Sequence, residues 1–249
     1  GNLLNRSGHL WVYRSETFRN ASADWAIRKR LGYNFKFLNQ ADTKAIEPAL
    51  GALAKCAVQT EEWAIYSDPK AYALGLMESL HKQGVEFVEC DVKSVDGNKI
   101  TDSNGNSIFF NKLVIAAGAW AHHLSSCLGD YCPLESERGY NTTLPYAGVS
   151  LQRMVTFAQD HFVATPMSMG LRIGGAIEFA GLDAPPNFSR SKALLKLAKK
   201  YFPNLNIDGG IEWMGHRPST PDSLPVIDRA SRHANIFYAF GHGHLGLTG

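Results

Sequence analysis

The chain contains 249 residues, 45% of them hydrophobic, and carries a formal net charge of +2. This length supports one large hydrophobic core or two smaller ones. The small net charge argues against a nucleic-acid-binding protein, which would present a strongly basic face. No apolar run approaches about 18 residues, so the sequence predicts no transmembrane segment.

The first third of the chain predicts short strands and helices. Residues 9–13 form an apolar strand, and Ser15 is a candidate N-cap for a helix that ends near Leu31. Asp68 followed by Pro69 is a strong helix start, because proline is favoured at the first helical position. That helix is expected to reach Gln83, and we also predict strands at 35–38 and 85–88 and a short helix at 41–47.

Two hairpins are expected next, because Asp96-Gly97 and Asn104-Gly105 are typical tight-turn pairs. They separate predicted strands at residues 91–95, 98–101 and 107–110. A small apolar strand at 113–117 then leads into Gly118 and a helix at 121–128.

The pattern changes from Pro133 onward to longer alternating strands, which indicates an antiparallel sheet. A basic amphipathic helix is predicted at 189–201, before Pro203. Because the two kinds of segment interleave, the sequence predicts a mixed α/β fold with two lobes between which the chain crosses more than once. The strands predicted for this antiparallel sheet lie at 140–144, 154–158, 161–165 and 171–179. Further strands are predicted at 211–214, 226–227 and 236–240.

The four cysteines point to a reducing compartment. Cys56, Cys90, Cys127 and Cys132 show no C-x-x-C spacing, and the simplest interpretation is four free thiols in a cytoplasmic protein. A zinc site that joins Cys127 and Cys132 to His122 and His123 is a weaker alternative, since its spacing matches no common zinc pattern.

The last strand runs into a glycine-rich loop, Gly241-His-Gly-His-Leu-Gly246. Its G-x-G-x-x-G spacing is typical of loops whose N–H groups surround an anion. A dinucleotide fingerprint also needs a second strand and an acidic residue about 20 positions later, and neither follows here. Either the match is accidental or the loop belongs to another part of a nucleotide site. The histidines in the loop suit acid–base chemistry or a polar loop near an anion better than a metal.

Arg217 lies in a turn-rich segment between His216 and Pro218. A rigidly held arginine can present its planar guanidinium to a carboxylate. The alternatives are an exposed loop arginine or a structural pair with Asp222.

Several longer segments together resemble the FAD-dependent amino-acid oxidoreductases of the D-amino-acid oxidase superfamily, most closely the bacterial D-amino-acid dehydrogenase group. The resemblance covers nearly the whole chain. The segments that carry it are residues 8–13, 114–120, 137–140, 171–181, 213–227 and 240–248.

This resemblance implies a glutathione-reductase-like architecture of two lobes. Residues 67–132 and 215–249 are expected to form part of a Rossmann-like FAD lobe. Residues 1–66 and 133–214 are expected to form a substrate lobe on an antiparallel sheet. The first βαβ unit of the family has no counterpart in this sequence, so we expect a chain truncated at both ends.

The resemblance also implies roles for individual residues. Arg217 is expected to bind the substrate carboxylate, with Tyr140 lining the same pocket, whereas no residue is assigned as catalytic or as a metal ligand. Phe162 departs from the family pattern, because some relatives place a tyrosine in this strand. The expected cofactor-binding residues are Val92, Ala116, Ala117, Gly118, Trp120, Gly241, His242, Gly243, His244, Leu245, Gly246, Leu247 and Thr248.

Two functional hypotheses follow from these expectations. In the first, the parent protein oxidises D-amino acids or related imino acids by hydride transfer from Cα to N5 of FAD. The electrons then pass to oxygen or to a membrane quinone, and a quinone acceptor would place the protein at the periphery of the inner membrane. In the second, the chain is an inactive substrate-lobe scaffold that cannot hold FAD.

Overall fold

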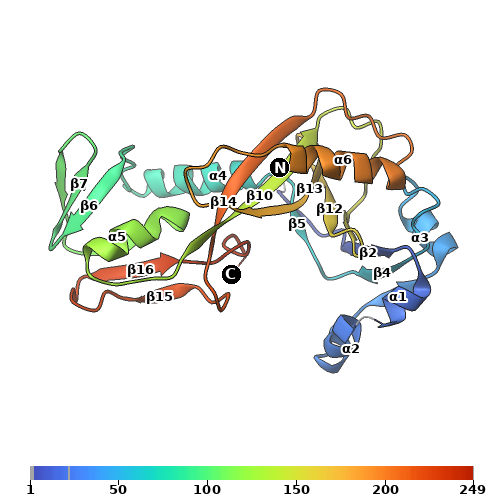
Figure 1. The fold of residues 1–249 in the computed structure, drawn as a ribbon, viewed down its shortest axis with the longest axis horizontal. Helices are drawn as coiled ribbons and strands as arrows, with labels where there is room; N and C mark the ends of the chain where they lie inside the picture. The colour runs from blue at the N-terminus through green and yellow to red at the C-terminus, as the bar shows by residue number, and fades with distance from the viewer. Residues whose placement is uncertain (1–2, 22, 249) are drawn as a thin grey trace. The chain divides into compact units, whose positions relative to one another are not determined.

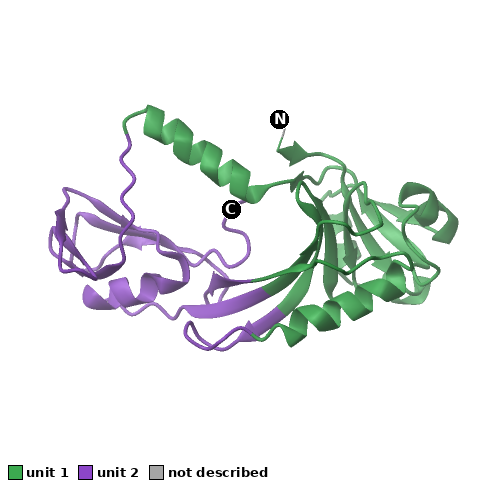
Figure 2. Cartoon of the chain, turned by 90° about the horizontal axis from the view of Figure 1, so that it is seen from above, with its two compact units in different colours: residues 1–84, 140–176, 187–213 green, residues 85–139, 177–186, 214–249 purple. Residues whose placement is uncertain are grey.

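The computed structural model describes residues 3–21 and 23–248. The chain divides into two compact units, which Figure 2 distinguishes by colour. Compactness does not identify what a unit binds, so the assignment of residue ranges to lobes stays a prediction. Unit 1 comprises residues 1–84, 140–176 and 187–213, and unit 2 comprises residues 85–139, 177–186 and 214–249.

An eight-stranded sheet has the order β14-β10-β13-β12-β11-β2-β4-β3. Its central strands pair antiparallel, except that β11 is parallel to β2. The antiparallel sheet predicted for this part of the chain is confirmed. The strands are β2 (His9–Tyr13), β3 (Lys36–Leu38), β4 (Cys56–Thr60), β10 (Glu135–Leu144), β11 (Met154–Phe157), β12 (Phe162–Met167), β13 (Gly170–Phe179) and β14 (Ile211–Ser219).

The main core lies between one face of this sheet and helix α6 (Ser189–Tyr201), as Figure 1 shows. Phe157 and Phe162 stack there with ring centroids 4.2 Å apart, and both are fully buried. Because side chains alternate along a strand, the opposite face carries His9, Trp11 and Tyr13 of β2. The predicted bounds of α6 are confirmed.

The N-terminal helices differ from the prediction. The Oγ of Ser15 accepts a hydrogen bond from the Phe18 N–H at 3.1 Å, which confirms the predicted cap. The single helix expected to reach Leu31 is instead two helices, and position 22 between them lies outside the described residues. The remaining helices of unit 1 are α1 (Glu16–Ala21), α2 (Ala23–Arg30), α3 (Gln40–Ile46) and α4 (Pro69–Lys82), and a short pair joins β1 (Leu4–Asn5) to β5 (Ile65–Tyr66).

Unit 2 contains two three-stranded sheets. In the first, β16 (Ile236–Phe240) is parallel to β9 (Leu113–Ile115) and antiparallel to β15 (Val226–Arg229). The second confirms the predicted hairpins, with strands β6 (Val92–Asp96), β7 (Lys99–Asp102) and β8 (Ser107–Phe109). The segment Gly118–Trp120 (η1) and helix α5 (Ala121–Cys127) follow β9.

The strand predicted at residues 85–88 is wrong. This segment has no regular secondary structure, and Phe87 and Val88 are exposed. An apolar run forms a strand only when a neighbouring strand pairs with its backbone, and the described residues contain no strand paired with this segment.

Candidate functional site

Strand β16 positions the glycine loop. Its last residue, Phe240, is buried in the core of unit 2. Gly241 then has φ +84°, and a Cβ there would lie 3.0 Å from the Thr220 side chain. His242 bridges Ser219, and the Gly243 N–H donates to the Pro218 carbonyl at 2.8 Å. The loop is therefore fixed against the end of strand β14.

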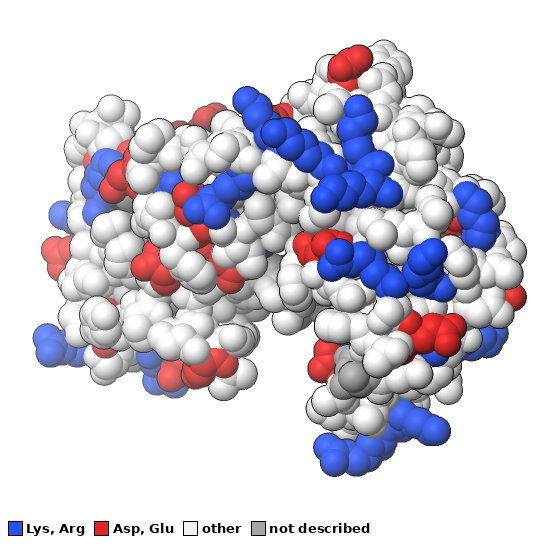
Figure 3. Space-filling view, turned by 45° about the vertical axis from the view of Figure 1, so that its right-hand side comes forward, with Lys and Arg blue, Asp and Glu red and all other residues white. Residues whose placement is uncertain are grey.

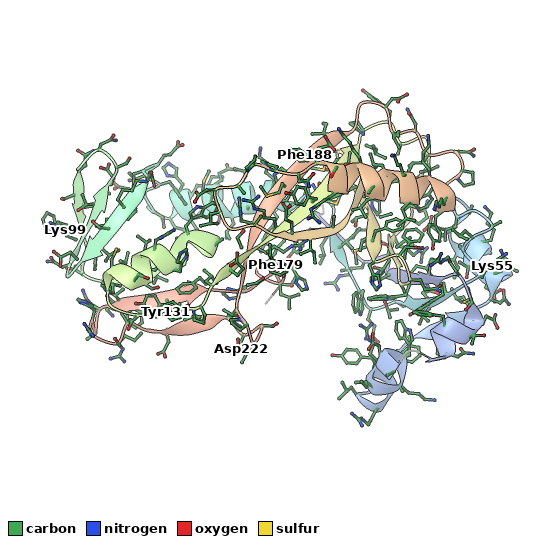
Figure 4. The ribbon with its side chains drawn as sticks, in the orientation of Figure 1. Lys55, Lys99, Tyr131, Phe179, Phe188 and Asp222 are labelled. Atoms are coloured by element: carbon green, nitrogen blue, oxygen red, sulfur yellow. The ribbon has the colours of Figure 1, made fainter. Side chains whose placement is uncertain are left out.

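The glycine loop forms one wall of a cavity of about 730 Å³ within unit 2, which we call the glycine-loop cavity. The predicted residues Gly241 to Leu245 line it. Leu247 and Gly246 lie in the turns that follow, and the Thr248 N–H closes them on the Leu245 carbonyl at 2.9 Å. Figure 4 labels Tyr131 and Phe179, two aromatic residues that also line this cavity.

Arg217 forms a structural pair near this cavity, but not with the partner considered from the sequence. Its Nη1 donates to Oε1 of Glu137 at 2.8 Å, and the Ser219 Oγ donates to Oε2 of the same carboxylate at 3.1 Å. Glu137 and Ser219 both line the cavity. Asp222 instead accepts a hydrogen bond from the Leu224 N–H within its own turn. The sequence did not single out Glu137.

Gly139 explains how the guanidinium can lie flat on strand β10. A Cβ at this position would be 2.5 Å from Nη2 of Arg217 and 2.7 Å from Cζ. Any side chain there would displace the guanidinium, so Gly139 and Glu137 together fix where Arg217 lies.

His216 occupies the opposite face of β14. Its Nδ1 lies 2.7 Å from the Ser136 Oγ, and its ring meets Trp120 edge to face at 5.2 Å. Burial, together with the nearby charge of Arg138, holds the pKa of His216 below its usual value. The imidazole is therefore neutral at physiological pH.

A second cavity of unit 2, about 750 Å³, lies at the end of strand β9, and we call it the strand-end cavity. It brings together Val92, Ala116, Ala117 and Trp120, which are distant in sequence but were predicted to share one cofactor. Gly118 is not among its lining residues, and its φ of +54° makes the turn that begins after Ala117.

Tyr140 belongs to unit 1 and is 1% exposed. Its hydroxyl accepts a hydrogen bond from the Asn187 N–H at 3.0 Å, and its ring meets Phe188 edge to face. These contacts describe a core residue, so its role in substrate binding stays a prediction.

The described residues contain no group of three or more His, Cys, Asp or Glu side chains that could hold a metal ion. The face in Figure 3 mixes Lys and Arg with Asp and Glu. Within the described ranges, no helix is both long enough and apolar enough to cross a membrane.

Comparison with protein families identifies the class. The model of the DAO family, described as FAD dependent oxidoreductase, matches residues 2–249. The chain therefore belongs to this family of FAD-dependent oxidoreductases.

Individual relatives agree with the family match. The chain is 32% identical to a D-amino-acid oxidase of Bradyrhizobium diazoefficiens over 99% of its own length, and covers 61% of that protein. It is 31% identical to a D-amino acid dehydrogenase of Paramagnetospirillum magneticum, over 97% of its own length and 60% of the relative. The chain thus spans about three fifths of each relative.

The fold is also that of a solved flavoprotein structure. An L-alpha-glycerophosphate oxidase from Mycoplasma pneumoniae with FAD bound superposes with a TM-score of 0.81. The match is 20% identical and covers all of this chain and 71% of the other. At this identity the similarity shows the two-lobe fold and not the substrate.

Proposed function

We propose that the chain forms the substrate-binding region and part of the flavin-binding region of an enzyme that oxidises the Cα–N bond of D-amino acids or related imino acids. Family membership and the names of the two relatives support this reaction class. The observation that carries the substrate class is the guanidinium of Arg217, which Glu137 and Gly139 hold in a fixed position beside the glycine-loop cavity. A fixed guanidinium suits the carboxylate that every amino acid carries.

The residues of unit 2 fit FAD. Small side chains at Ala116 and Ala117 allow a cofactor close to the backbone in the strand-end cavity. The backbone of residues 241–245 lines the glycine-loop cavity, where a glycine-rich turn suits the anionic edge of a reduced flavin. We propose that the strand-end cavity holds the adenine side of FAD and that the glycine-loop cavity holds the flavin ring.

FAD, when bound, supplies the hydride acceptor. The side chains bind and orient the substrate. Arg217 binds the carboxylate, while Glu137 holds the opposite side of the guanidinium and the Ser219 hydroxyl holds Glu137. No side-chain base is required when the substrate amine enters neutral. The oxidised imine then reacts with water to give a keto acid and ammonia.

FAD binding by the chain is the first test. The purified chain is incubated with FAD, passed through a desalting column and examined by visible absorption spectroscopy. Retained flavin absorbance is the expected result. A colourless chain at every FAD concentration would contradict the assignment of the two cavities, and would favour the inactive scaffold.

Arg217 provides the second test, in flavin-loaded protein that turns over D-amino acids. Arg217→Leu should raise KM by about tenfold or more, because a charged hydrogen-bonded contact to substrate is lost. The matched control is Arg229→Leu on exposed strand β15. An unchanged KM in Arg217→Leu would remove this residue from carboxylate binding.

The electron acceptor is a separate proposal, since one relative is named an oxidase and the other a dehydrogenase. From the resemblance stated above, we propose a quinone acceptor and a peripheral position on the inner membrane. Reduction of a soluble quinone analogue without formation of hydrogen peroxide is expected. Stoichiometric peroxide would instead identify oxygen as the acceptor.

A further inference from the structure

Three tryptophans of unit 1 surround one arginine. The Cζ of Arg28 lies 5.0 Å from the ring centroid of Trp11, 4.9 Å from that of Trp25 and 5.6 Å from that of Trp63. Arg28 and Trp25 come from helix α2, Trp11 from strand β2, and Trp63 from the turn after β4. We call these four residues the indole cluster.

The charge of Arg28 has no carboxylate partner among the described residues. No ion pair involves its side chain, and its Nη1 is buried without a hydrogen-bond acceptor. The indole faces attract the guanidinium, but they do not neutralise it. Partly buried charges in proteins are normally paired, so an unpaired guanidinium here indicates room for an anionic group.

His9 provides a second observation on the same cluster. It is 1% exposed, and its ring centroid lies 5.0 Å from that of Trp63. Its Nε2 lies 2.8 Å from the Thr156 Oγ1, but its Nδ1 has no partner within the described part of the chain, and neither does Nε1 of Trp11. Burial and the charge of Arg28 lower the pKa of His9 to about 3, so the ring is neutral.

The indole cluster borders a cavity of about 430 Å³ that lies entirely in unit 1, which we call the α2 cavity. Arg28 and Trp63 line it, together with the apolar side chains of Ile27, Tyr33 and Phe35. The volume lies within the range of small-molecule sites.

Two carboxylates complete the wall of the α2 cavity, those of Asp24 and Glu62. Glu62 is held in place, because the Asn34 Nδ2 donates to its Oε1 at 2.9 Å. The cavity therefore presents one cation, two anions and an aromatic wall. An α-amino acid with an apolar side chain carries the complementary groups.

We propose that the α2 cavity binds an α-amino acid with an aromatic or large apolar side chain. Arg28 binds its carboxylate, Asp24 and Glu62 bind its ammonium group, and the side chain packs on Tyr33 and Phe35. The proposal uses residues of unit 1 only and does not depend on the flavin assignment.

Tryptophan fluorescence of the whole chain tests this proposal without any enzymatic activity, because three of the five tryptophans belong to the cluster. Titration with D- or L-phenylalanine should give a saturable change. Hydrocinnamate, which lacks the ammonium group, and phenethylamine, which lacks the carboxylate, should each bind more weakly than phenylalanine. The absence of a saturable change with either phenylalanine enantiomer would overturn the proposal.

Two arginine variants test whether the charge of Arg28 binds the ligand. Arg28→Met should weaken phenylalanine binding about tenfold or more, whereas Arg30→Met, an exposed neighbour outside the cavity, should bind as the unaltered chain does. Equal affinity in Arg28→Met would overturn the proposal.

Circular dichroism shows whether Arg28→Met has folded. Since Asp24 and Glu62 are exposed, the variant D24N/E62Q tests the site without disturbing the indole cluster. This variant should lower the affinity for phenylalanine but not the affinity for hydrocinnamate. An equal loss of affinity for both ligands, or no loss for phenylalanine, would contradict the ammonium assignment. Arg217→Leu should titrate normally, which separates this site from the proposed substrate carboxylate site.

Discussion

The two units bury apolar side chains to different extents. In unit 1, the central strands of the eight-stranded sheet and helix α6 enclose Phe157 and Phe162 completely. In unit 2, apolar strand residues such as Phe109, Val114 and Ile227 stay more than half exposed. Val114 lines the strand-end cavity. Because buried apolar area is the main source of stability, unit 1 holds most of the packing energy, whereas unit 2 presents the surfaces proposed to bind the cofactor.

Replacing a phenylalanine by alanine should lower the free energy of unfolding far more in unit 1 than in unit 2, and this is the largest difference that we expect between the units. Phe157→Ala removes a ring that stacks on Phe162 and also contacts Tyr201 and Phe202. It should lower the free energy of unfolding by about 3–5 kcal/mol. Phe109→Ala, 71% exposed on β8, should change it by less than about 0.5 kcal/mol. Urea denaturation measures both, and similar losses would refute the comparison.

A buried charged residue of unit 2, Arg138, is expected to contribute strongly to the free energy of unfolding. Arg138 is 0% exposed, its Nε donates to the Gly181 carbonyl at 2.8 Å, and its Nη1 lies 3.7 Å from Oε2 of Glu178. Arg138→Met should cost about 3 kcal/mol of unfolding free energy, since the hydrogen bond from the buried guanidinium to the Gly181 carbonyl and its ion pair with Glu178 are both lost. The control is exposed Arg229→Met.

A double-mutant cycle separates the charge pair from packing. If the ion pair matters, R138M/E178Q should recover part of the loss seen in Arg138→Met. Additive losses would show that the carbonyl hydrogen bonds account for the effect.

Local chemistry made part of the fold predictable. The Asp96-Gly97 and Asn104-Gly105 turns determine the hairpins of unit 2, and the apolar stripe of residues 189–201 predicts α6. The strand expected at 85–88 failed because pairing depends on a neighbouring strand, which a local pattern does not contain.

The site was less predictable because its contacts join distant residues. Arg217 was recognised, but its partner Glu137 lies 80 positions away, and the nearer Asp222 was an equally reasonable choice from the sequence. The indole cluster likewise joins residues 11, 25, 28 and 63, which no sequence motif connects. The strand-end cavity was predictable only through the family resemblance, which placed Val92 with Ala116 and Ala117.

Helix capping differs between helices of the same unit as well as between the units. In unit 1, Oδ1 of Asn39 accepts a hydrogen bond from the Asp42 N–H at 2.9 Å and caps α3, whereas α6 of unit 1 and α5 of unit 2 both start without a side-chain cap. Asn39→Ala should cost about 1 kcal/mol, and Asn39→Ser should restore most of it. Thermal unfolding of the unaltered chain and of the two variants measures these changes in stability. If Asn39→Ser loses as much stability as Asn39→Ala, capping is excluded as the cause.

The smallest expected effect concerns the pH dependence of unit 2. Hydrogen bonds from the Ser231 side chain, from Tyr238 and from the Ser231 N–H hold the pKa of Asp130 below its usual 3.8. A carboxyl group whose pKa is lower in the folded state adds stability above its unfolded pKa, and that stability is lost as the pH falls through the folded pKa.

The difference in unfolding free energy between the unaltered chain and Asp130→Asn should therefore shrink as the pH falls from about 6 to about 3. Because Asp130 lies near the surface, solvent screening keeps this change small. Asp208→Asn in unit 1 is the matched control for the loss of an exposed aspartate, since the carboxylate of Asp208 accepts no hydrogen bond from any residue the structure describes. A constant difference for Asp130→Asn would mean that Ser231 and Tyr238 bind the neutral carboxyl as well as the carboxylate.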